Sequence, residues 1–450
     1  MKARYVIDMT EGNEVSLMIK FSLPMLIGNV FQQLYNMVDS IIVGKFVNAN
    51  ALASIGVTSS IGFLFFSVCL GLSVGVGIVI SQYFGAREDK NVKIAIANSI
   101  YVIGITSIVI SILAFVLARP ILELMKTPAV ILDDAVVYLK IISAGTLAVG
   151  AYNAISCILR ALGDSRTPLF FLIVASIINV VLDLIFVLNF GWGVAGAAIA
   201  TVISQAVAAL GCVVFAVRTE YYFRLNKEDL KVNWDIIKEC IKVGIPVSIQ
   251  NSTIAVSLIA LQNIVNRFGE VAVASYTTVS RIEQLIQQPF NSLGAAMSTY
   301  AAQNMGANKI ERIKKGYHKT IIIIVIFSLA AFLGAQFGGA TIMRLFVNEE
   351  DVIALGAKGI RITSYAYFFL GMIYITRGLL NGAGDTVYAM INGFVEVIGR
   401  VGFSSILYIL PVFGVMSIWI TTGLTWFITA MASIVRYKQG KWKTKSIVKQ

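Results

Sequence analysis

Long uninterrupted stretches of apolar residues recur from one end of the chain to the other, separated by short polar segments. A helix needs about 20 apolar residues to cross the hydrocarbon core of a bilayer, so each stretch predicts a membrane-spanning helix. The stretches lack the strict alternation of apolar and polar residues that is typical of a transmembrane β-barrel. We therefore expect twelve helical spans, at about residues 16–46, 52–82, 94–118, 133–160, 167–190, 194–217, 238–266, 271–301, 316–340, 355–381, 387–410 and 415–436.

The pattern of the first half returns in the second half at a near-constant spacing of 221 or 222 residues. The matching pairs are Pro24 with Pro246, Val43–Phe46 with Val265–Phe268, Gly85-Ala86 with Gly306-Ala307, Gly163-Asp164 with Gly384-Asp385, and Gly193-Val194 with Gly414-Val415. Six spans in each half give both halves the same orientation, so they are parallel repeats, an architecture typical of secondary transporters. The sequence predicts an all-α integral membrane protein with an N-terminal six-helix bundle at 1–217, a cytoplasmic linker at 218–233, and a C-terminal six-helix bundle at 234–450.

The composition rules out a large soluble domain. Hydrophobic residues make up 57% of the chain and charged residues only 13%, whereas soluble domains carry about 25% charged residues. The net charge of +12 could indicate nucleic-acid binding, but the Lys and Arg residues concentrate on one side of the predicted membrane. This positive-inside pattern predicts a multi-pass protein of the cell inner (plasma) membrane with both termini in the cytoplasm. We expect the basic segments to contact anionic membrane lipids and no nucleic acid.

Signatures of enzymes and cofactors are weak in this chain. Residues 71–75 fit the G-x-S-x-G nucleophile pattern, but no strand is predicted before them and the only histidine, His318, is remote in sequence. The same glycines fit the small-xxx-small contact between membrane helices, which we expect instead. No zinc, Walker A or dinucleotide-binding motif occurs, so we expect no enzymatic activity and no cofactor besides a coupling ion. Pro24 and Pro246 either kink the first helix of each half or occupy its first turn.

Two acidic residues fall inside predicted spans of the first half, where an ionisable side chain is costly and indicates function. Asp39 in the first span and Asp183 in the fifth lie 16 or 17 residues beyond the start of the hydrocarbon. At about 1.5 Å rise per residue, both carboxyl groups should reach a similar level in the outer half of the membrane. Tyr35 and Asn179 precede the two aspartates by one turn on the same face, and Thr201 of the sixth span descends to a similar level.

This expected cluster has two chemical uses. A carboxyl group held beside a second carboxylate in a poorly solvated cavity can take up a proton near neutral pH. Alternatively, the oxygens of Asp39, Asn179, Asp183 and Thr201 are hard ligands suited to Na⁺. A third interpretation is that each aspartate only satisfies polar groups between helices. We expect the ion-coupling role, with H⁺ or Na⁺ as the ion.

The second half lacks the cluster. Leu261, Arg400 and Ser404 occupy the positions that correspond to Asp39, Asn179 and Asp183, and only the threonine is retained, as Thr422. The sequence therefore predicts that ion coupling resides in the first half alone.

Other polar side chains within the spans are candidates for substrate or gating contacts. Glu396 and Arg400 lie at i, i+4 in the eleventh span and can pair, either as a structural pair or as a gate. Arg281 in the eighth span could pack between helices or face a water-filled cavity. Asn153 and Gln33 belong to a set of amides that can bond between helices or line such a cavity.

Together these motifs resemble the MATE (multidrug and toxic compound extrusion) transporters, in particular their DinF-like branch, over residues 10–440. The residues that carry the resemblance are Pro24, Leu34-Tyr35-Asn36-Met37-Val38-Asp39, Arg160-Ala161-Leu162-Gly163-Asp164-Ser165-Arg166-Thr167-Pro168, Asn179-Val180-Val181-Leu182-Asp183 and Gly193-Val194-Ala195-Gly196-Ala197-Ala198-Ile199-Ala200-Thr201.

The resemblance implies two six-helix bundles around a central cleft that work by rocker-switch alternating access. It implies export of small cationic amphipathic compounds in exchange for H⁺ or Na⁺, with coupling at the same five residues of the first half. The NorM-like branch uses acids in the seventh and tenth spans, where this chain has Ile254 and Leu370, and Glu396 departs from both branches. The alternative is a flippase for a lipid-linked saccharide or other amphiphile, and a channel or a hydrolase using Ser73 are further classes. We expect a monomer.

Overall fold

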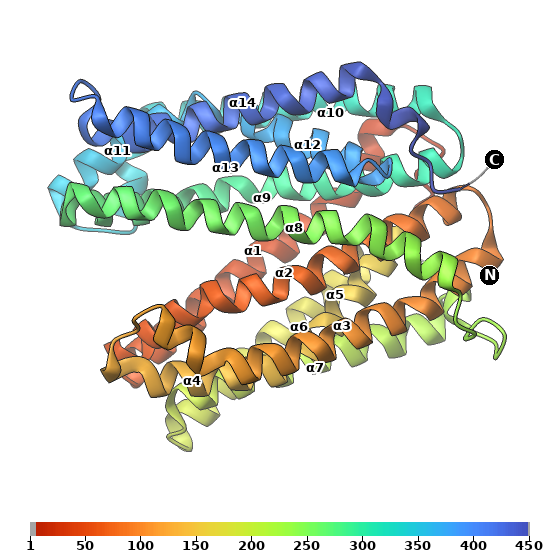
Figure 1. Cartoon of the computed structure of the whole chain (residues 1–450), viewed down its shortest axis with the longest axis horizontal. Coiled ribbons are helices and arrows are strands. Elements are labelled where there is room, and N and C mark those ends of the chain that lie inside the picture. Colours follow the sequence, from red (N-terminus) through yellow and green to blue (C-terminus); the bar gives the residue numbers. More distant parts are fainter. Residues whose placement is uncertain (1–5, 449–450) are drawn as a thin grey trace. The chain divides into compact units, whose positions relative to one another are not determined.

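The computed structural model describes residues 6–448, so residues 1–5 and 449–450 of the two expected halves lie outside the described part. Within it the chain forms helices joined by short turns (Figure 1). The first half contains α1 (Glu14–Phe46), α2 (Ala49–Gly85), α3 (Asp89–Leu124), α4 (Ala129–Ala144), α5 (Thr146–Ala161), α6 (Arg166–Asp183), the π-helix η1 (Leu184–Asn189) and α7 (Gly193–Thr219). The linker contains η2 (Tyr221–Phe223). The second half contains α8 (Trp234–Val265), η3 (Asn266–Phe268), α9 (Glu270–Gly306), α10 (Ile310–Arg344), α11 (Glu350–Ser364), α12 (Tyr367–Gly382), α13 (Thr386–Ile409), η4 (Gly414–Met416), α14 (Ser417–Gln439) and η5 (Lys441–Thr444).

These helices match the twelve predicted spans, two of which are broken. Among the described residues, nine helices are long and apolar enough to cross a membrane, and the pair α4 and α5, bent by 47°, makes a tenth. The helix α9 and the pair α11 and α12 are more polar and fall outside this group. They occupy the repeat positions of α2 and of the α4–α5 pair, so the expected pattern of spans is retained while their composition has diverged.

The sequence repeat is also a repeat of backbone conformation. Gly163 and Gly384 both have positive φ, at 96° and 91°, and each directly precedes an aspartate at the start of a helix. Arg87 and Asn308 share the left-handed conformation, with φ of 62° and 57°. Side chains other than glycine rarely adopt this region. The turns that join the helices are therefore conserved between the two halves, although most side chains differ.

The two prolines lie well inside their helices. Pro24 is in α1 and Pro246 is in α8, each beyond the first two turns. A proline removes a hydrogen bond within the helix and weakens it at that point. The interpretation that these prolines occupy a first turn was therefore wrong.

The chain divides into two compact units whose borders cross both of these helices. Unit 1 comprises residues 1–9, 23–249 and 447–450, and unit 2 comprises residues 10–22 and 250–446. The beginning of α1 thus belongs to unit 2, and the beginning of α8 belongs to unit 1. In both helices the border falls within one turn of the proline.

Unit 1 holds the beginning of α8 through a contact of small residues. A Cβ added to Gly71 of α2 would lie 2.2 Å from the Ser248 hydroxyl oxygen, and one added to Gly75 would lie 2.5 Å from the Gly244 Cα atom. The Ser248 hydroxyl donates to the carbonyl oxygen of Val68 at 3.0 Å. The predicted small-xxx-small contact is confirmed, with a second small pair on α8 as its partner.

The hydroxyl at the centre of the G-x-S-x-G pattern has a structural use. Ser73 is fully buried, and its Oγ donates to the carbonyl oxygen of Cys69 at 2.8 Å. Since it lies in the middle of α2 rather than at a strand-to-helix turn, the arrangement that would activate a serine nucleophile is not formed.

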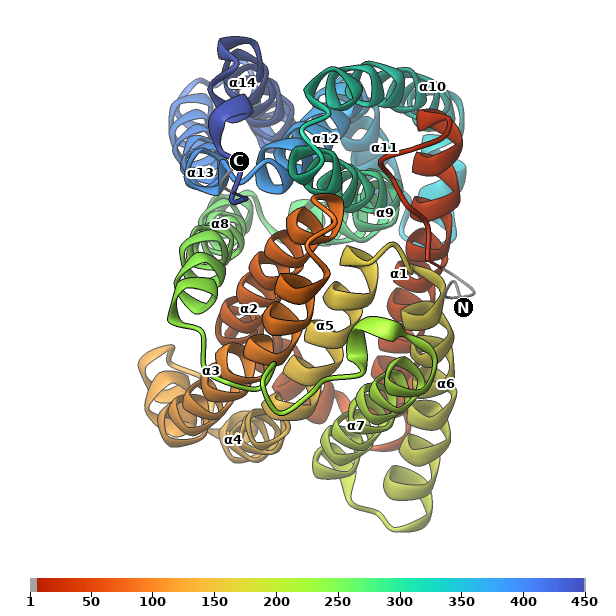
Figure 2. The same ribbon diagram turned by 90° about the vertical axis from the view of Figure 1, so that its right-hand side faces the viewer.

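Unit 2 holds the beginning of α1 through charges on α10. The Glu14 carboxylate forms ion pairs with Lys319 at 2.7 Å and with Arg312 at 3.5 Å. Lys309 also donates to the carbonyl oxygen of Thr10 at 2.9 Å. Deeper in this unit, α12 packs against α9, α10 and α14, and α13 packs against α14 (Figure 2).

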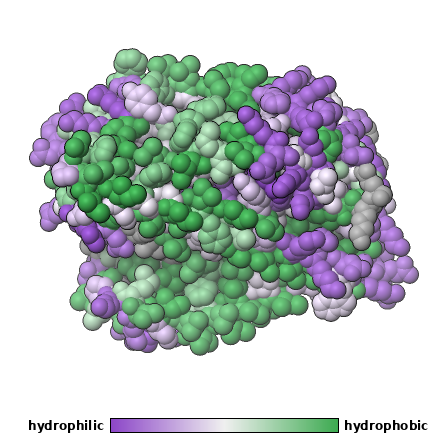
Figure 3. All heavy atoms as spheres, turned by 45° about the horizontal axis from the view of Figure 1, so that its top comes forward, coloured by the Kyte–Doolittle hydropathy of each residue, from purple (hydrophilic) through white to green (hydrophobic). Residues whose placement is uncertain are grey.

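The surface of the helices is apolar where it would meet lipid. On the face shown in Figure 3, hydrophobic residues cover a broad band and hydrophilic residues gather at its ends. In α10 the exposed fractions reach 60% at Ile322, 65% at Ile326 and 85% at Phe337. Exposed apolar surface of this extent is unfavourable in water and is expected of helices that contact lipid.

Candidate functional sites

Unit 1 brings together the polar side chains predicted for ion coupling. Asp39 comes from α1, Asn179 and Asp183 from α6, and Thr201 from α7, where α6 packs against α7. Asp183 is fully buried and Asn179 is 2% exposed, whereas Asp39 is half-buried. A cavity of about 10 Å³ lies between these helices, lined by Tyr35, Leu172, Ala175, Ser176, Asn179, Thr201, Ser204 and Gln205. This volume suits a single water molecule or a small ion.

The polar atoms of this cluster are unusual because they lack hydrogen-bond partners. Among the described residues, none satisfies Asp39 Oδ1, either side-chain atom of Asn179, or either oxygen of Asp183. The same holds for Gln205 Oε1. Buried polar atoms are nearly always paired in proteins, and each unpaired one costs about 1–3 kcal/mol. A group of unpaired atoms at one place therefore marks a site that a proton, ion or water completes.

The two carboxyl groups approach each other closely enough to interact. Asp39 and Asp183 can share a hydrogen bond when one of them is protonated, and their negative charges repel each other when neither is. Thr201 donates its hydroxyl to the carbonyl oxygen of Ala197 at 3.0 Å and keeps its oxygen lone pairs available. The set thus offers both a place for a proton and the carboxylate, amide and hydroxyl oxygens that a hard cation needs.

The backbone changes its geometry directly beside this cluster. The α-helical hydrogen-bonding pattern of α6 ends at Asp183, and the π-helix η1 begins at the next residue. Helix segments with π geometry are rare and occur frequently at functional sites. No periodicity in the sequence indicates this change, so sequence reasoning missed it.

Sequence reasoning also missed two neighbours of the cluster. Tyr138 of α4 lies near enough to Asp39 and Asp183 to interact with their charges. Gln205 of α7 contacts Tyr35 and lies one turn after Thr201. Both are polar residues within predicted spans, and the i, i+4 spacing from Thr201 was the available signal for Gln205.

The other predicted contacts are less informative. Asn153 donates its side-chain amide to the carbonyl oxygen of Val149 in its own helix, at 2.8 Å. Gln33 is half-buried on α1. Arg281 is exposed in the middle of α9 rather than packed between helices.

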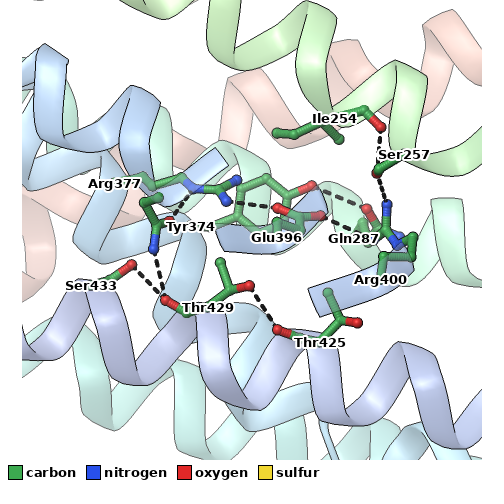
Figure 4. A network of polar contacts seen from close by, with 11 residues as sticks. Ile254, Ser257, Gln287, Tyr374, Arg377, Glu396, Arg400, Thr425, Thr429 and Ser433 are labelled. Carbon is green, nitrogen blue, oxygen red and sulfur yellow. Dashed lines mark hydrogen bonds and ion pairs between the residues drawn. The ribbon is translucent and has the colours of Figure 1, made fainter. Parts of the chain in front are cut away.

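Unit 2 contains a buried network of charges at the repeat position of the first cluster. The Glu396 carboxylate forms an ion pair with Arg400 at 3.0 Å, so the predicted i, i+4 pair is formed. Its other carboxylate oxygen forms an ion pair with Arg377 of α12 at 2.6 Å (Figure 4). The three side chains are 4–11% exposed. Sequence reasoning missed Arg377, although an arginine within a predicted span was itself a signal.

Neutral polar groups complete this network. Arg377 Nε donates to Asn392 Oδ1 at 2.7 Å, and Asn392 in turn donates to the carbonyl oxygen of Thr429 at 2.8 Å. Arg400 Nη1 donates to the hydroxyl of Ser257, whereas Arg400 Nε is buried without a partner among the described residues. Both oxygens of Glu396 are thus occupied by arginines, which leaves one positive charge in excess.

The Gly-Asp motifs of the two halves have acquired different partners. The Asp164 carboxylate accepts the backbone N–H groups of Arg166 and Thr167, at 2.9 and 3.0 Å, at the start of α6. Asp385 instead forms a bidentate ion pair with Arg436 of α14, at 2.7 and 3.0 Å.

A buried carboxyl group near Asp164 lies just beyond α7, outside the spans. Glu220 is 2% exposed, and burial, together with the neighbouring charge of Asp164, raises the pKa of Glu220 to about 7. A carboxyl group with this pKa changes its charge within the physiological range.

Comparison with known proteins places the chain in a family. The MatE family profile matches residues 24–185 and 246–406, one match in each half and most of the chain in total. The chain belongs to the MATE family. The family is one of multi-pass membrane transporters for multidrug efflux, and the two matches correspond to the repeats found in the sequence.

Relatives and solved structures in this family cover nearly the whole chain. The "Probable multidrug resistance protein YpnP" of Bacillus subtilis is 29% identical over 98% of this chain and 98% of its own length. The "Probable multidrug resistance protein NorM" of Thermotoga maritima is 24% identical over 96% of this chain and 94% of its own length. The crystal structure of MATE in the straight conformation superposes with a TM-score of 0.90 at 23% identity, over 98% of this chain and all of the other.

Proposed function

We propose that this MATE protein is a secondary active exporter that exchanges small cationic amphipathic compounds for H⁺ or Na⁺ by rocker-switch alternating access. The observation that carries the proposal is the set of buried oxygens without partners at Asp39, Asn179 and Asp183. Relatives are named multidrug resistance proteins, which supports drug-like substrates. We place the protein in the plasma membrane as a monomer with both termini in the cytoplasm.

The coupling follows because the cluster favours different helix arrangements with and without a bound proton or cation. Without a proton or cation, the charges of Asp39 and Asp183 repel each other in a poorly solvated place, which favours a more open, hydrated arrangement of α1 and α6. Binding of the ion removes this repulsion and favours close packing. An ion that prefers one arrangement, and a substrate that prefers the other, are coupled by linkage.

The ion is open between H⁺ and Na⁺, and the described residues can serve either. For H⁺, the two carboxyl groups share one proton. For Na⁺, Asp39, Asp183 and Asn179 supply carboxylate and amide oxygens, Thr201 supplies a hydroxyl, and the small cavity admits water as a further ligand. In the DinF-like interpretation the second half contributes no coupling residue, since Arg400 and Ser404 replace the amide and the carboxylate.

The experiment is efflux of a cationic dye from vesicles that contain the purified protein, with pH and Na⁺ gradients imposed separately. Efflux driven by one gradient names the ion. Asp39→Asn and Asp183→Asn should each abolish gradient-driven efflux, because the amide cannot exchange a proton and lacks the charge that attracts Na⁺. Ser404→Ala, at the repeat position of Asp183, is the matched control and should leave efflux within about twofold of the unchanged protein, as expected for a residue away from the site.

Two results would contradict the proposal. Equal loss of efflux in Ser404→Ala would show that coupling is not confined to unit 1. No efflux under either gradient, by protein whose thermal unfolding transition shows that it is folded, would favour the flippase alternative and a lipid-linked substrate.

A further inference from the structure

The three charged side chains that form the buried ion pairs of unit 2 sum to one positive charge. Arg377 and Arg400 both bind Glu396, and each carboxylate oxygen already has a guanidinium partner. Glu283 of α9 is a further buried carboxyl group that lies close enough to Arg400 to interact with its charge, and its Oε1 atom has no hydrogen-bond partner among the described residues. An unbalanced guanidinium within a membrane span is costly, so such groups usually pair with an anion or face a polar cavity.

The buried network can still donate a hydrogen bond to a further acceptor. Arg400 is 4% exposed and its Nε–H has no partner among the described residues, although guanidinium N–H groups form a fork suited to two oxygens. A structural ion pair would be expected to satisfy this atom. A buried donor without a partner, next to an excess positive charge, fits an oxyanion that binds during part of the working cycle.

A polar stripe on the surface of unit 2 lies near the network. Tyr374 is close enough to Glu396, Arg377 and Arg400 to interact with their charges, and its hydroxyl donates to the Gln287 side-chain oxygen at 3.0 Å (Figure 4). Gln287 lies on α9, between residues of that stripe in the sequence. Arg281 and Gln284 are exposed and Gln288 is half-buried, at spacings of three and four residues that place them on one face of the helix. An exposed arginine and two glutamines in the middle of a membrane helix require a hydrated or charged environment rather than lipid tails.

The surroundings of the stripe indicate what kind of anion can reach it. Leu285, four residues after Arg281 and three before Gln288, lies on the same face of α9 and is 42% exposed, so an apolar side chain lies among the polar ones of the stripe. A molecule that carries an oxyanion and an apolar chain can contact both kinds of side chain at once. A small inorganic anion would use only the polar ones.

From this arrangement we propose that unit 2 contains a binding site for the oxyanion of an amphiphile, such as a phosphate or carboxylate head group, formed by Arg377 and Arg400 and entered past Arg281. The oxyanion accepts from the free Nε–H of Arg400 and competes with Glu396 for the guanidinium groups. Its use as a transport site rests on the export function proposed above. It extends the range of substrates from cations to zwitterions and anions.

The test measures binding of dodecyl phosphate, below its micellar concentration, to the full-length protein in nanodiscs of zwitterionic phosphatidylcholine. Dodecyltrimethylammonium provides the cation of equal chain length, and inorganic phosphate provides the anion without a chain. We expect dodecyl phosphate to bind. Arg400→Gln should weaken its binding about tenfold or more, the loss expected for a hydrogen bond to a charged group.

The decisive variant is Glu396→Gln, because it separates a binding site from a structural pair. Removing the competing carboxylate raises the net charge around the arginines, so dodecyl phosphate should bind more tightly. A purely structural role predicts no gain. Arg281→Gln, on the exposed surface, provides a variant that keeps the buried network and should weaken binding if Arg400→Gln fails to fold.

The outcomes are distinct. Binding of dodecyl phosphate alone supports an amphiphile, and binding of inorganic phosphate as well supports a site that recognises the oxyanion by itself. No preference for dodecyl phosphate over dodecyltrimethylammonium, or weaker binding in Glu396→Gln, overturns the proposal and indicates that the charge is balanced internally. Asp39→Asn separates the two proposals, since it should lose coupled efflux and keep dodecyl phosphate binding.

Discussion

Replacing Gly75 by alanine should weaken the contact that holds the beginning of α8 in unit 1. A Cβ at this position would lie 2.5 Å from the Gly244 Cα atom, 2.6 Å from its nitrogen and 2.9 Å from the Cys240 carbonyl oxygen. Ordinary contacts of a Cβ atom begin at 3.4 Å. All three atoms belong to the backbone of α8, so rotation of a side chain cannot relieve the overlap.

The geometry sets the size of the effect. The two helices must separate by about 1 Å, and a gap of 0.5–1 Å already forfeits about a quarter to a half of each dispersion contact along the interface. Overpacking of this kind costs about 1–3 kcal/mol. The same substitution improves helix propensity by up to about 1 kcal/mol, which offsets part of the loss. We therefore expect a net loss of about 1–2 kcal/mol.

The assay is thermal unfolding of the purified protein, with Gly62→Ala in the same helix as the matched control. A Cβ at Gly62 would meet no atom within 4 Å, so only the gain in propensity remains and the melting temperature should stay equal or rise. The two variants should thus shift stability in opposite directions. Equal or higher melting temperatures for both would refute the close approach of α2 and α8.

Two further predictions concern the Gly-Asp turns and their surroundings. Because the pKa of Glu220 is raised to about 7 in the folded protein, the folded state keeps a proton that the unfolded state releases between pH 4.5 and 7. The free energy of unfolding should therefore fall across this pH interval by up to about 3 kcal/mol. Melting curves of Glu220→Gln, measured over the same interval, should lack this part of the decline. Asp385→Asn should lower the free energy of unfolding by about 2 kcal/mol, which is less than for a fully buried ion pair because Arg436 keeps 13% exposure. Asp164→Asn should cost about 1 kcal/mol or less, because an amide oxygen can still accept hydrogen bonds from the backbone N–H groups. Denaturation of both variants under one condition checks the order, and a larger loss at Asp164 would contradict it.

Much of the fold was predictable from the sequence. Apolar stretches of the length of a bilayer leave the backbone no favourable alternative to a helix, because every polar backbone group must be satisfied within the segment. The spacing of 221 or 222 residues between matching motifs revealed the repeat without any structure. The grouping of Asp39 with Asp183 was predictable too, since depth along a spanning helix follows from the residue count.

Other features depended on side chains that meet only after folding. Helix periodicity places a residue on a face, but it does not say which neighbour covers that face. The pairing of Arg377 with Glu396 joins α12 to α13, and the contact of Gly71 and Gly75 with α8 joins residues far apart in the chain. The division of α1 and α8 between two compact units likewise comes from packing, and the prolines only indicated where a helix can yield.

The amino-acid sequence by itself determined which segments are helical, how often the pattern repeats and at what depth each ionisable residue lies, because these properties depend on hydrophobicity and on rise per residue along one chain. The tertiary structure alone decided which polar atoms remain without partners and which charges remain unbalanced. Those properties depend on which side chains from several different helices meet in the folded protein. The unpaired oxygens of Asp183 in the first half and the unpaired Nε–H of Arg400 in the second half are the result.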